Sequence, residues 1–373
     1  MSAAAARRRK QQQKKKLAST NEEILKLLDE SGDSEASAYE ALQLAVSLCQ
    51  KHQDAVLACT GAKLLLQKGR ISVASQLMDL AIQLLRETET ASTDSLVTTL
   101  VGVGEAHATA IADRSDSPDT VRLQRVCRDW WMAVIAWSSD FGTVRYGDPQ
   151  LHAAAAEQCW ALATKDSTST KDVEEEEQQE DQLYLDAIQH GALAEKPSWI
   201  TDRLKECEKP TDEQTAAGHT VTAALRDRLL TKAVLVCVAV ENVRDAATIA
   251  QKYAKEIEER DIDELAKSYT NKSDGKAPSH IIFCNMLLRI VCKDVPTKPL
   301  FQWLLRSFAR EGGNDAAPLT TKIGRLYFQI QPPPNMLSMM ENMMGGGGLG
   351  GGAGGINPAM MQAALAQMQG GGM

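Results

Sequence analysis

The sequence predicts an all-α protein: an α-solenoid of stacked helical hairpins (tetratricopeptide-like) with disordered N- and C-terminal tails. Three observations support this fold class. Aromatic residues make up only 5% of the 373 residues, while Ala, Leu, Gln and Glu, which favour helices, are abundant. Pairs of apolar-striped segments recur, and a short turn joins the members of each pair. Both ends of the chain are low-complexity segments without the composition of a packed core.

Changes in composition along the chain predict its domains. A basic disordered tail covers 1–18, the solenoid covers 19–331, and a Pro/Met/Gly-rich disordered tail covers 332–373. The stretch 7–16 carries seven positive charges in a chain whose net charge is −8. We interpret it as a solvated tail, with a nuclear or ribosome-facing basic patch as the alternative. An acidic body with a short basic segment at one end lacks the basic surface of a nucleic-acid-binding protein.

Three stretches of the predicted solenoid show the same hairpin pattern. The clearest turns at 68–70, a second turns at 241–242, and a looser copy turns at 31–32. Small residues directly after the turns let two helices approach closely. Because a hairpin of this size cannot bury its apolar face alone, neighbouring copies must stack on one another. The expected product is a solenoid with extended faces.

The stretch AWSSDFGTVRYGDPQLH, residues 136–152, contains serine, aspartate and histidine, which are the residue types of a catalytic triad. A nucleophilic serine needs a strained G-x-S-x-G elbow or another activating geometry, and the stretch has neither. Its two serines end an amphipathic helix, and Asp148 followed by Pro149 is a typical start of the next one. We therefore interpret the stretch as a joint between two helices, with His152 packed at the start of the second, and predict no catalytic residue.

A polar segment interrupts the predicted solenoid. Residues 165–182 are almost wholly polar and include a block of four glutamates, so we expect a mobile acidic loop there. A phosphorylation or docking role for the Ser and Thr residues at 167–170 is the alternative to a plain linker.

Several classes of protein do not fit the sequence. The longest apolar run, 233–240, has eight residues, against the roughly 20 that cross a bilayer, so we expect a soluble, cytosolic protein. The eight cysteines form no C-x-x-C pair and have no histidine at zinc spacing. Without a secretory signal they should stay reduced and act as small core residues. We expect no metal, no cofactor and no enzymatic activity.

Four motifs stand in a characteristic order along the predicted solenoid. They are the hairpin at 63–85, a helix that ends in Trp-Ser-Ser, a Gly-x-Pro-x-Leu-His restart, and an Ile-Gly-x-Leu-(aromatic)-Phe signature that runs into Pro-Pro. By these motifs the chain resembles the Golgi-to-ER traffic protein four family, the scaffold subunit of the guided entry of tail-anchored proteins, from about residue 20 to about 335. The resemblance implies a mainly structural role for Trp137, Ser138, Ser139, Gly147, Pro149, Leu151, His152, Ile323, Gly324, Leu326, Tyr327, Phe328, Pro332 and Pro333.

The resemblance implies an adaptor without catalysis. Its N-terminal helices would hold the targeting ATPase of the pathway, and its C-terminal half would hold a ubiquitin-like partner that recruits a co-chaperone carrying tail-anchored clients. The helix that follows Pro299 carries more apolar surface than one face can hide, which makes Trp303, Leu304 and Phe308 the candidate contacts of the ubiquitin-like partner. Polar residues off the apolar stripes are the candidate contacts of the ATPase: Lys26, Asp29, Glu40, Lys51 and Lys63.

Two other scaffold classes are alternatives. A proteasome-lid or signalosome-type subunit would need a winged-helix end with a β-strand pattern, and 280–330 shows none. A tetratricopeptide co-chaperone would need a clamp of Lys, Asn and Arg over 34-residue repeats, and no such period is found.

Overall fold

The computed structural model divides the chain into two units, Met1–Gln329 and Ile330–Met373. The helices described by the structure lie in the first unit. The residues that the structure describes are 22, 26, 35–114, 119–164, 173–208, 221–270, 278–293, 297–308 and 313–330.

Helices joined by turns and short loops make up the described part of the chain, which contains no strand. The all-α prediction is therefore confirmed. The helices, in order, are α2 (Glu35–His52), α3 (Ala55–Gln67), α4 (Ile71–Glu87), α5 (Asp94–Ala112), α6 (Thr120–Phe141), α7 (Pro149–Ala163), α8 (Val173–Leu193), α9 (Pro197–Glu208), α11 (Ala223–Ala239), α12 (Val243–Glu256), α13 (Ile262–Thr270), α14 (His280–Val291), α15 (Lys298–Phe308) and α16 (Gly313–Phe328).

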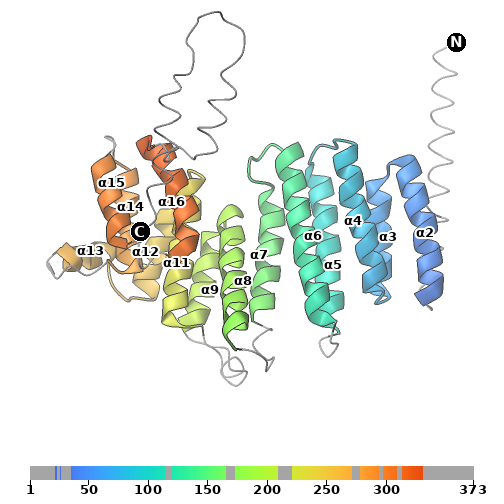
Figure 1. Ribbon diagram of the computed structural model, residues 1–373, viewed down its shortest axis with the longest axis horizontal. Coiled ribbons are helices and arrows are strands. Elements are labelled where there is room, and N and C mark those ends of the chain that lie inside the picture. The colour runs from blue at the N-terminus through green and yellow to red at the C-terminus, as the bar shows by residue number, and fades with distance from the viewer. Residues whose placement is uncertain are drawn as a thin grey trace, which may run out of the picture. The chain divides into compact units, whose positions relative to one another are not determined.

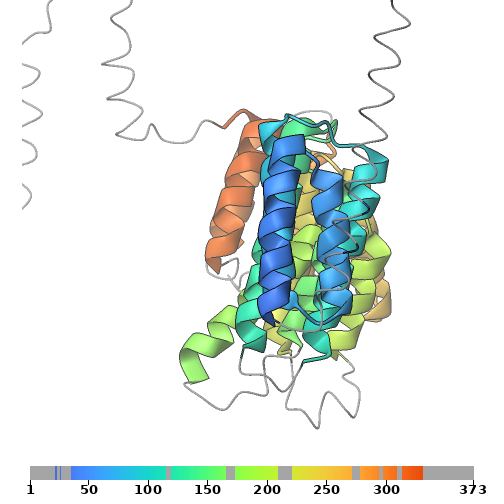
Figure 2. The ribbon, with the colours of Figure 1, turned by 90° about the vertical axis from the view of Figure 1, so that its right-hand side faces the viewer.

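The helices of this unit stack in the manner of a solenoid. From α2 to α7, most helices pack both on the next helix in sequence and on the one after it, as α3 packs on α4 and α5. Figure 1 shows α2 to α7 standing side by side in chain order, and Figure 2, which looks from the α2 end, shows α2 and α3 at the front of two layers. Alternate helices thus form two layers, and each hairpin covers the apolar face of its neighbour.

Two of the predicted hairpin turns form where the sequence placed them. Gly69 adopts a φ of +69° between α3 and α4, a left-handed conformation that glycine reaches without a steric cost. At the second turn Glu241 also has a positive φ, and Asn242 caps α12 by accepting a hydrogen bond from the backbone N–H of Asp245 (3.2 Å). The third turn, at 31–32, lies outside the described residues.

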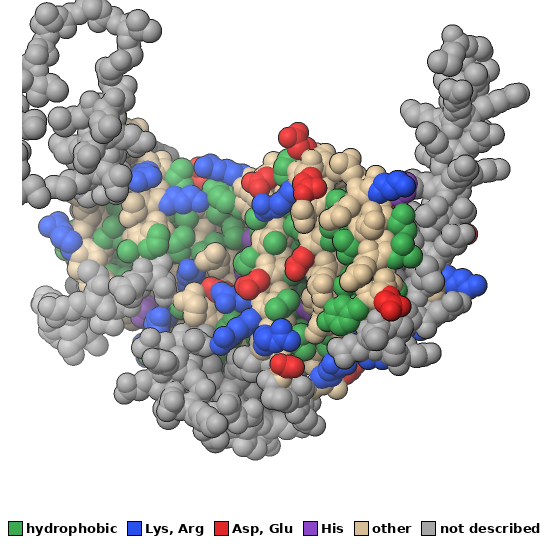
Figure 3. Space-filling view, turned by 45° about the vertical axis from the view of Figure 1, so that its right-hand side comes forward, with side chains coloured by type: hydrophobic (Ala, Val, Ile, Leu, Met, Phe, Trp, Pro, Cys, Tyr) green, Lys and Arg blue, Asp and Glu red, His purple; other side chains and the backbone are tan. Residues whose placement is uncertain are grey.

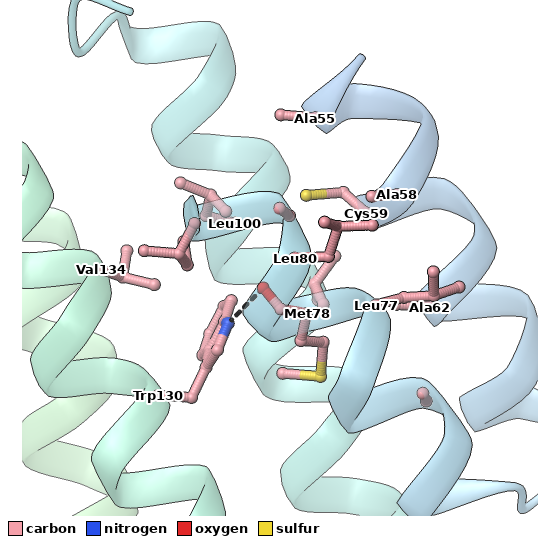
Figure 4. Packing of buried hydrophobic residues seen from close by; sticks show 14 of the residues in the cluster. Ala55, Ala58, Cys59, Ala62, Leu77, Met78, Leu80, Leu100, Trp130 and Val134 are labelled. Atoms are coloured by element: carbon pink, nitrogen blue, oxygen red, sulfur yellow. Dashed lines mark hydrogen bonds between the residues drawn. The ribbon is translucent and has the colours of Figure 1, made fainter. Parts of the chain in front are cut away.

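The hydrophobic core runs between the layers and is tightly packed around α4, α5 and α6 (Figure 4). The indole N–H of Trp130 donates to the Met78 carbonyl (3.2 Å), which ties α6 to α4. A Cβ atom on Gly104 would lie only 2.2 Å from Cζ2 of Trp131. Glycine at this position of α5 therefore provides the space that the ring on α6 fills.

The acidic segment differs from its prediction. Helix α8 begins at Val173, so the expectation of a loop through residue 182 is wrong from this residue on, and 165–172 lie outside the described residues. Glu and Gln, which dominate this stretch, have a high intrinsic helix propensity. Their polarity made the segment look like a linker, although the same residues extend the helix that later packs on α7 and α11.

The last helix turns back against the middle of the unit. Helix α16 packs on α11 and α15, and the Tyr327 hydroxyl donates to the Val238 carbonyl (3.1 Å). Near its middle, Lys322 donates to the Tyr146 hydroxyl (3.0 Å) in the loop between α6 and α7. The C-terminal helix thus contacts the joint of residues 136–152 across 176 positions of sequence.

Candidate partner-docking surfaces

The outer face of α2 offers a mixed polar and apolar surface. Glu40, Leu44, Ser47 and Lys51 are all exposed, and their spacing of four, three and four residues places them on one side of the helix. Leu44, with 45% of its surface exposed, lies between the two charged residues. Sequence reasoning predicted the charged residues and missed Leu44, because a leucine in an amphipathic helix reads as core.

The remaining predicted ATPase contacts are distributed over two helical segments. Lys26 is exposed, Lys63 is exposed on α3, and Asp29 lies outside the described residues. Lys63 reaches toward α5, where its Nζ is 3.7 Å from the position that a Cβ atom on Gly102 would occupy. Val56 at the start of α3 is 49% exposed and adds a second apolar residue to this end of the unit.

Helix α15 separates its aromatic residues into a buried side and an exposed side. Leu304 and Phe308 are buried, so neither offers a surface to a partner, which corrects that part of the prediction. Phe308 stacks on Phe283 with 3.9 Å between ring centroids. Trp303 remains, 41% exposed, together with Leu300, 37% exposed. The excess of apolar residues is thus divided between the core and one exposed stripe.

The closing motif on α16 is divided in the same way. Ile323 and Phe328 are buried, and Phe328 stacks on Phe301 of α15 with centroids 4.4 Å apart. Leu326 is 40% exposed, while Pro332 and Pro333 lie outside the described residues. In Figure 3, apolar side chains reach the surface in separate groups, with charged side chains between them.

The joint between α6 and α7 is held by hydrogen bonds among the motif residues. Trp137 is buried, and its indole N–H donates to the Thr90 carbonyl (3.1 Å). The Ser138 hydroxyl donates to the Ile135 carbonyl (2.8 Å) and accepts from the backbone N–H of Asp148 (3.0 Å). With its hydroxyl committed to the backbone, Ser138 has no geometry for nucleophilic attack.

The backbone of the joint requires its glycine and its cap. Gly147 has a φ of +99°, and a Cβ there would lie 3.0 Å from both Ile135 Cγ2 and Ser138 Oγ. Asp148 caps α7 by accepting from the Gln150 N–H (2.8 Å), and Pro149 occupies the first turn. The start signal read from the sequence therefore matches the observed start of α7.

His152 continues the joint into the next helix. Its Nε2 lies 2.8 Å from the Tyr146 carbonyl and its Nδ1 lies 2.8 Å from Nδ1 of His190 on α8. Because a carbonyl only accepts, Nε2 carries the proton and Nδ1 accepts from His190 in the neutral pair. Burial lowers the pKa of both rings, that of His190 to about 3. His152 therefore orders the loop and packs α7 on α8.

Among models of protein families, the one for Golgi to ER traffic protein 4 matches residues 49–346, which is most of the chain. The chain belongs to this family. A crystal structure of Get4 from C. therm. has a similar fold, with a TM-score of 0.50 at 19% sequence identity, over 91% of this chain and 99% of that chain. A search of curated proteins gives no significant match.

Membership of the Golgi to ER traffic protein 4 family confirms the resemblance carried by the four motifs. It also selects this class over the lid-type subunit and the tetratricopeptide co-chaperone. Neither docking surface lies on a membrane-spanning element, since none of the helices described is both long and apolar enough to cross a bilayer.

No metal site is found among the described residues of the chain. Nowhere in them do three or more His, Cys, Asp or Glu side chains lie close enough together to hold a metal ion. All eight cysteines are free thiols. Burial raises the pKa of Cys59, Cys127 and Cys284 to about 12. Thiols with such pKa values stay protonated and pack as small apolar residues.

Proposed function

We propose that the chain is a cytosolic scaffold that tethers a targeting ATPase to a ubiquitin-like partner during delivery of tail-anchored proteins to the ER. The observation that supports this most is the membership of the Golgi to ER traffic protein 4 family over 49–346. Through the ubiquitin-like partner it would also bring in the co-chaperone that carries the client.

The two proposed docking surfaces are well separated. We assign the ATPase surface to the outer face of α2 together with Lys26 and Lys63, and the surface for the ubiquitin-like partner to the exposed stripe of α15 around Trp303. Figure 1 shows α2 and α15 at opposite ends of the row of helices. Two partners can therefore be bound at once without competing for the same residues.

A scaffold of this kind acts by raising the effective concentration of its two bound partners relative to each other. Tethering converts the meeting of two chaperones into an intramolecular event, with effective concentrations on the order of millimolar for short connections. A folded scaffold loses less conformational entropy on binding than a disordered one, so less of the contact energy is offset. The adaptor needs no catalytic group to accelerate the handover.

Charge reversal tests the ATPase surface. The variant Lys26→Glu/Lys51→Glu should weaken capture of the purified ATPase, because exposed charges steer and orient a polar contact. It should leave the ubiquitin-like partner bound. The matched control is Lys255→Glu/Lys293→Glu, which changes the net charge equally at exposed positions on and after other helices. Equal loss in both variants would show a general charge effect and reject this site.

A polar substitution tests the second surface. Trp303→Glu should abolish binding of the ubiquitin-like partner and leave ATPase capture unchanged, because an exposed aromatic residue is a typical interface anchor. Val144→Glu, at a residue that is 41% exposed in the α6–α7 loop, is the control. If Trp303→Glu binds both partners normally, the site lies elsewhere.

A further inference from the structure

Three cations meet where α16 lies against the α6–α7 loop. The amine of Lys322 lies 4.3 Å from the centroid of the Tyr146 ring, and the guanidinium carbon of Arg145 lies 5.5 Å from the same centroid. These two charges are therefore within about 10 Å of each other. Arg325 follows Lys322 by three residues and so lies on the same side of α16. Arg145 and Arg325 are exposed, and Lys322 is half-buried.

No carboxylate in the described part of the chain forms an ion pair with any of the three. The nearest acidic residue in the loop, Asp148, accepts the Gln150 N–H as the cap of α7. On other helices the arginines commonly have such partners, as Arg128 and Arg228 do with two aspartates of α8. Like charges this close repel one another, because the Debye length is about 10 Å at 0.1 M salt. An uncompensated cluster of this kind opposes folding, and such departures are typical of functional sites.

An exposed apolar residue adjoins the cations. Leu326, with 40% of its surface exposed, lies four residues after Lys322 and therefore one turn along the same side of α16. We call the surface of Arg145, Tyr146, Lys322, Arg325 and Leu326 the α16 patch. It combines positive charge with apolar area, so its complement is negatively charged and carries an apolar side chain.

The number of cations favours an acidic peptide over other anionic partners. Binding to an anionic membrane generally uses clusters of roughly four to eight Lys and Arg residues, and the α16 patch has three. Nucleic-acid binding generally uses a basic stripe on a basic domain, whereas this chain has a net charge of −8. A short segment with a few carboxylates matches both the size and the charge of the patch.

We propose that the α16 patch binds an acidic segment of a partner protein, in which Asp or Glu residues flank one large apolar side chain. The carboxylates would pair with Lys322 and with the guanidinium groups of Arg145 and Arg325, which bind carboxylates in a bidentate manner. The apolar side chain would contact Leu326. This proposal does not depend on the surfaces assigned to the ATPase and the ubiquitin-like partner.

A short peptide with this chemistry provides the test. Fluorescein-labelled Asp-Glu-Leu-Glu-Asp, with a C-terminal amide, is titrated with the full chain and followed by fluorescence anisotropy. We expect saturable binding with a Kd on the order of 0.1 to 1 mM at low salt. Binding should weaken about fivefold or more at about 0.5 M NaCl, where the charges are screened. The same peptide with lysine in place of its four acidic residues should not bind.

Charge reversal locates the site. Arg145→Glu/Arg325→Glu should weaken peptide binding about tenfold or more and leave the melting temperature unchanged, since neither guanidinium has an ion pair to lose. The matched control is Lys255→Glu/Arg260→Glu, which changes the net charge equally at exposed positions on and after α12. The control should bind the peptide as the unsubstituted chain does.

A thermodynamic cycle tests the apolar contact. Asp-Glu-Ser-Glu-Asp should bind the unsubstituted chain several-fold more weakly than the leucine peptide. In the variant Leu326→Ser the two peptides should bind equally, because both changes remove the same contact.

Four results would overturn the proposal. The first is the absence of saturable binding, and the second is an equal loss of binding in the two charge variants. The third is a leucine-to-serine difference that persists in Leu326→Ser. The fourth is tighter binding, dependent on Arg145 and Arg325, to oligothymidylate or to phosphatidylcholine vesicles with about 30% phosphatidylserine, which would assign the patch to nucleic acid or to a lipid surface.

Discussion

Two tryptophans show how differently the structure uses one residue type. Trp137 at the α6–α7 joint is fully buried and donates its indole N–H to the Thr90 carbonyl. Trp303 on α15 leaves 41% of its surface exposed. Both occur in amphipathic helices. The sequence predicted a structural role for Trp137 and a partner contact for Trp303.

The difference lies in how many helices pack around the helix that carries each tryptophan. The joint is enclosed: α6 packs on α4, α5 and α7, and α7 packs in turn on α8. Helix α15 packs on α14 and α16, so its outer side remains open. Interior hairpins of a solenoid are covered on two sides, while elements at an end have an uncovered face. The joint therefore stabilises the fold, and the α15 face is available for binding.

The largest expected effect is the loss of Trp137. Trp137→Ala removes a buried ring and leaves a cavity, and should destabilise the protein by about 3 to 5 kcal/mol. Urea unfolding followed by circular dichroism measures this. A cost of about 1 kcal/mol or less would show that the joint is as open as α15, which would remove the contrast.

Acidification should have the next largest effect on stability, through His107 on α5, which pairs with Ser75 on α4, and His190 on α8, which pairs with His152 of the joint. Burial lowers the pKa of His107 to about 4 and that of His190 to about 3. Below the unfolded value of about 6.5, the unfolded chain binds protons that the folded chain does not, so stability falls as pH falls from about 6.5 to about 4. Each of the two should contribute a loss on the order of 2 kcal/mol by about pH 5.

Urea unfolding at a series of pH values measures this dependence. His107→Gln should reduce the slope of stability against pH by the share of one residue, about 1.4 kcal/mol per pH unit. An unchanged slope would show that His107 is protonated in the folded state.

The two adjacent serines of the joint give a finer test. Ser138→Ala leaves the backbone N–H of Asp148 without its acceptor and should cost about 1 to 2 kcal/mol. Ser139→Ala removes only an exposed bond to the Arg145 carbonyl and should cost about 0.5 kcal/mol or less. Equal costs would contradict the role assigned to Ser138.

A small effect on stability is also expected at Trp303. Trp303→Ser should change the free energy of unfolding by about 1 kcal/mol or less, because much of the ring is already in water. The same variant should lose the ubiquitin-like partner in a pull-down. A large loss of stability would assign the ring to the core and remove it from the docking surface.

Much of the fold follows from local sequence patterns. The apolar stripes and the turns at 68–70 and 241–242 predict the hairpins, and Asp148 with Pro149 predicts the start of α7. These signals are local, since they depend on residues within one or two helical turns. The prediction of a loop in the acidic segment was wrong for the same reason. Its local polarity is typical of a linker, but the segment belongs to α8, which packs on α7 and α11 farther along its length.

Side-chain exposure on α15 and α2 could not be predicted in this way. Leu304 and Trp303 are neighbours in sequence, yet one is buried and the other exposed, because α14 and α16 cover one side of α15 only. Leu44 looked like a core residue, although no described helix covers the outer face of α2. Periodicity divides a helix into faces, but only the packed neighbours decide which face meets water.

By itself, the sequence determined the helical class, the hairpins, the chemistry of the joint and the family, because each of these depends on residues close together in the chain. Only the tertiary structure decided the pairing of His152 with His190 and the return of α16 to Tyr146. Each of these joins side chains from helices far apart in sequence, and their meeting depends on how the hairpins stack.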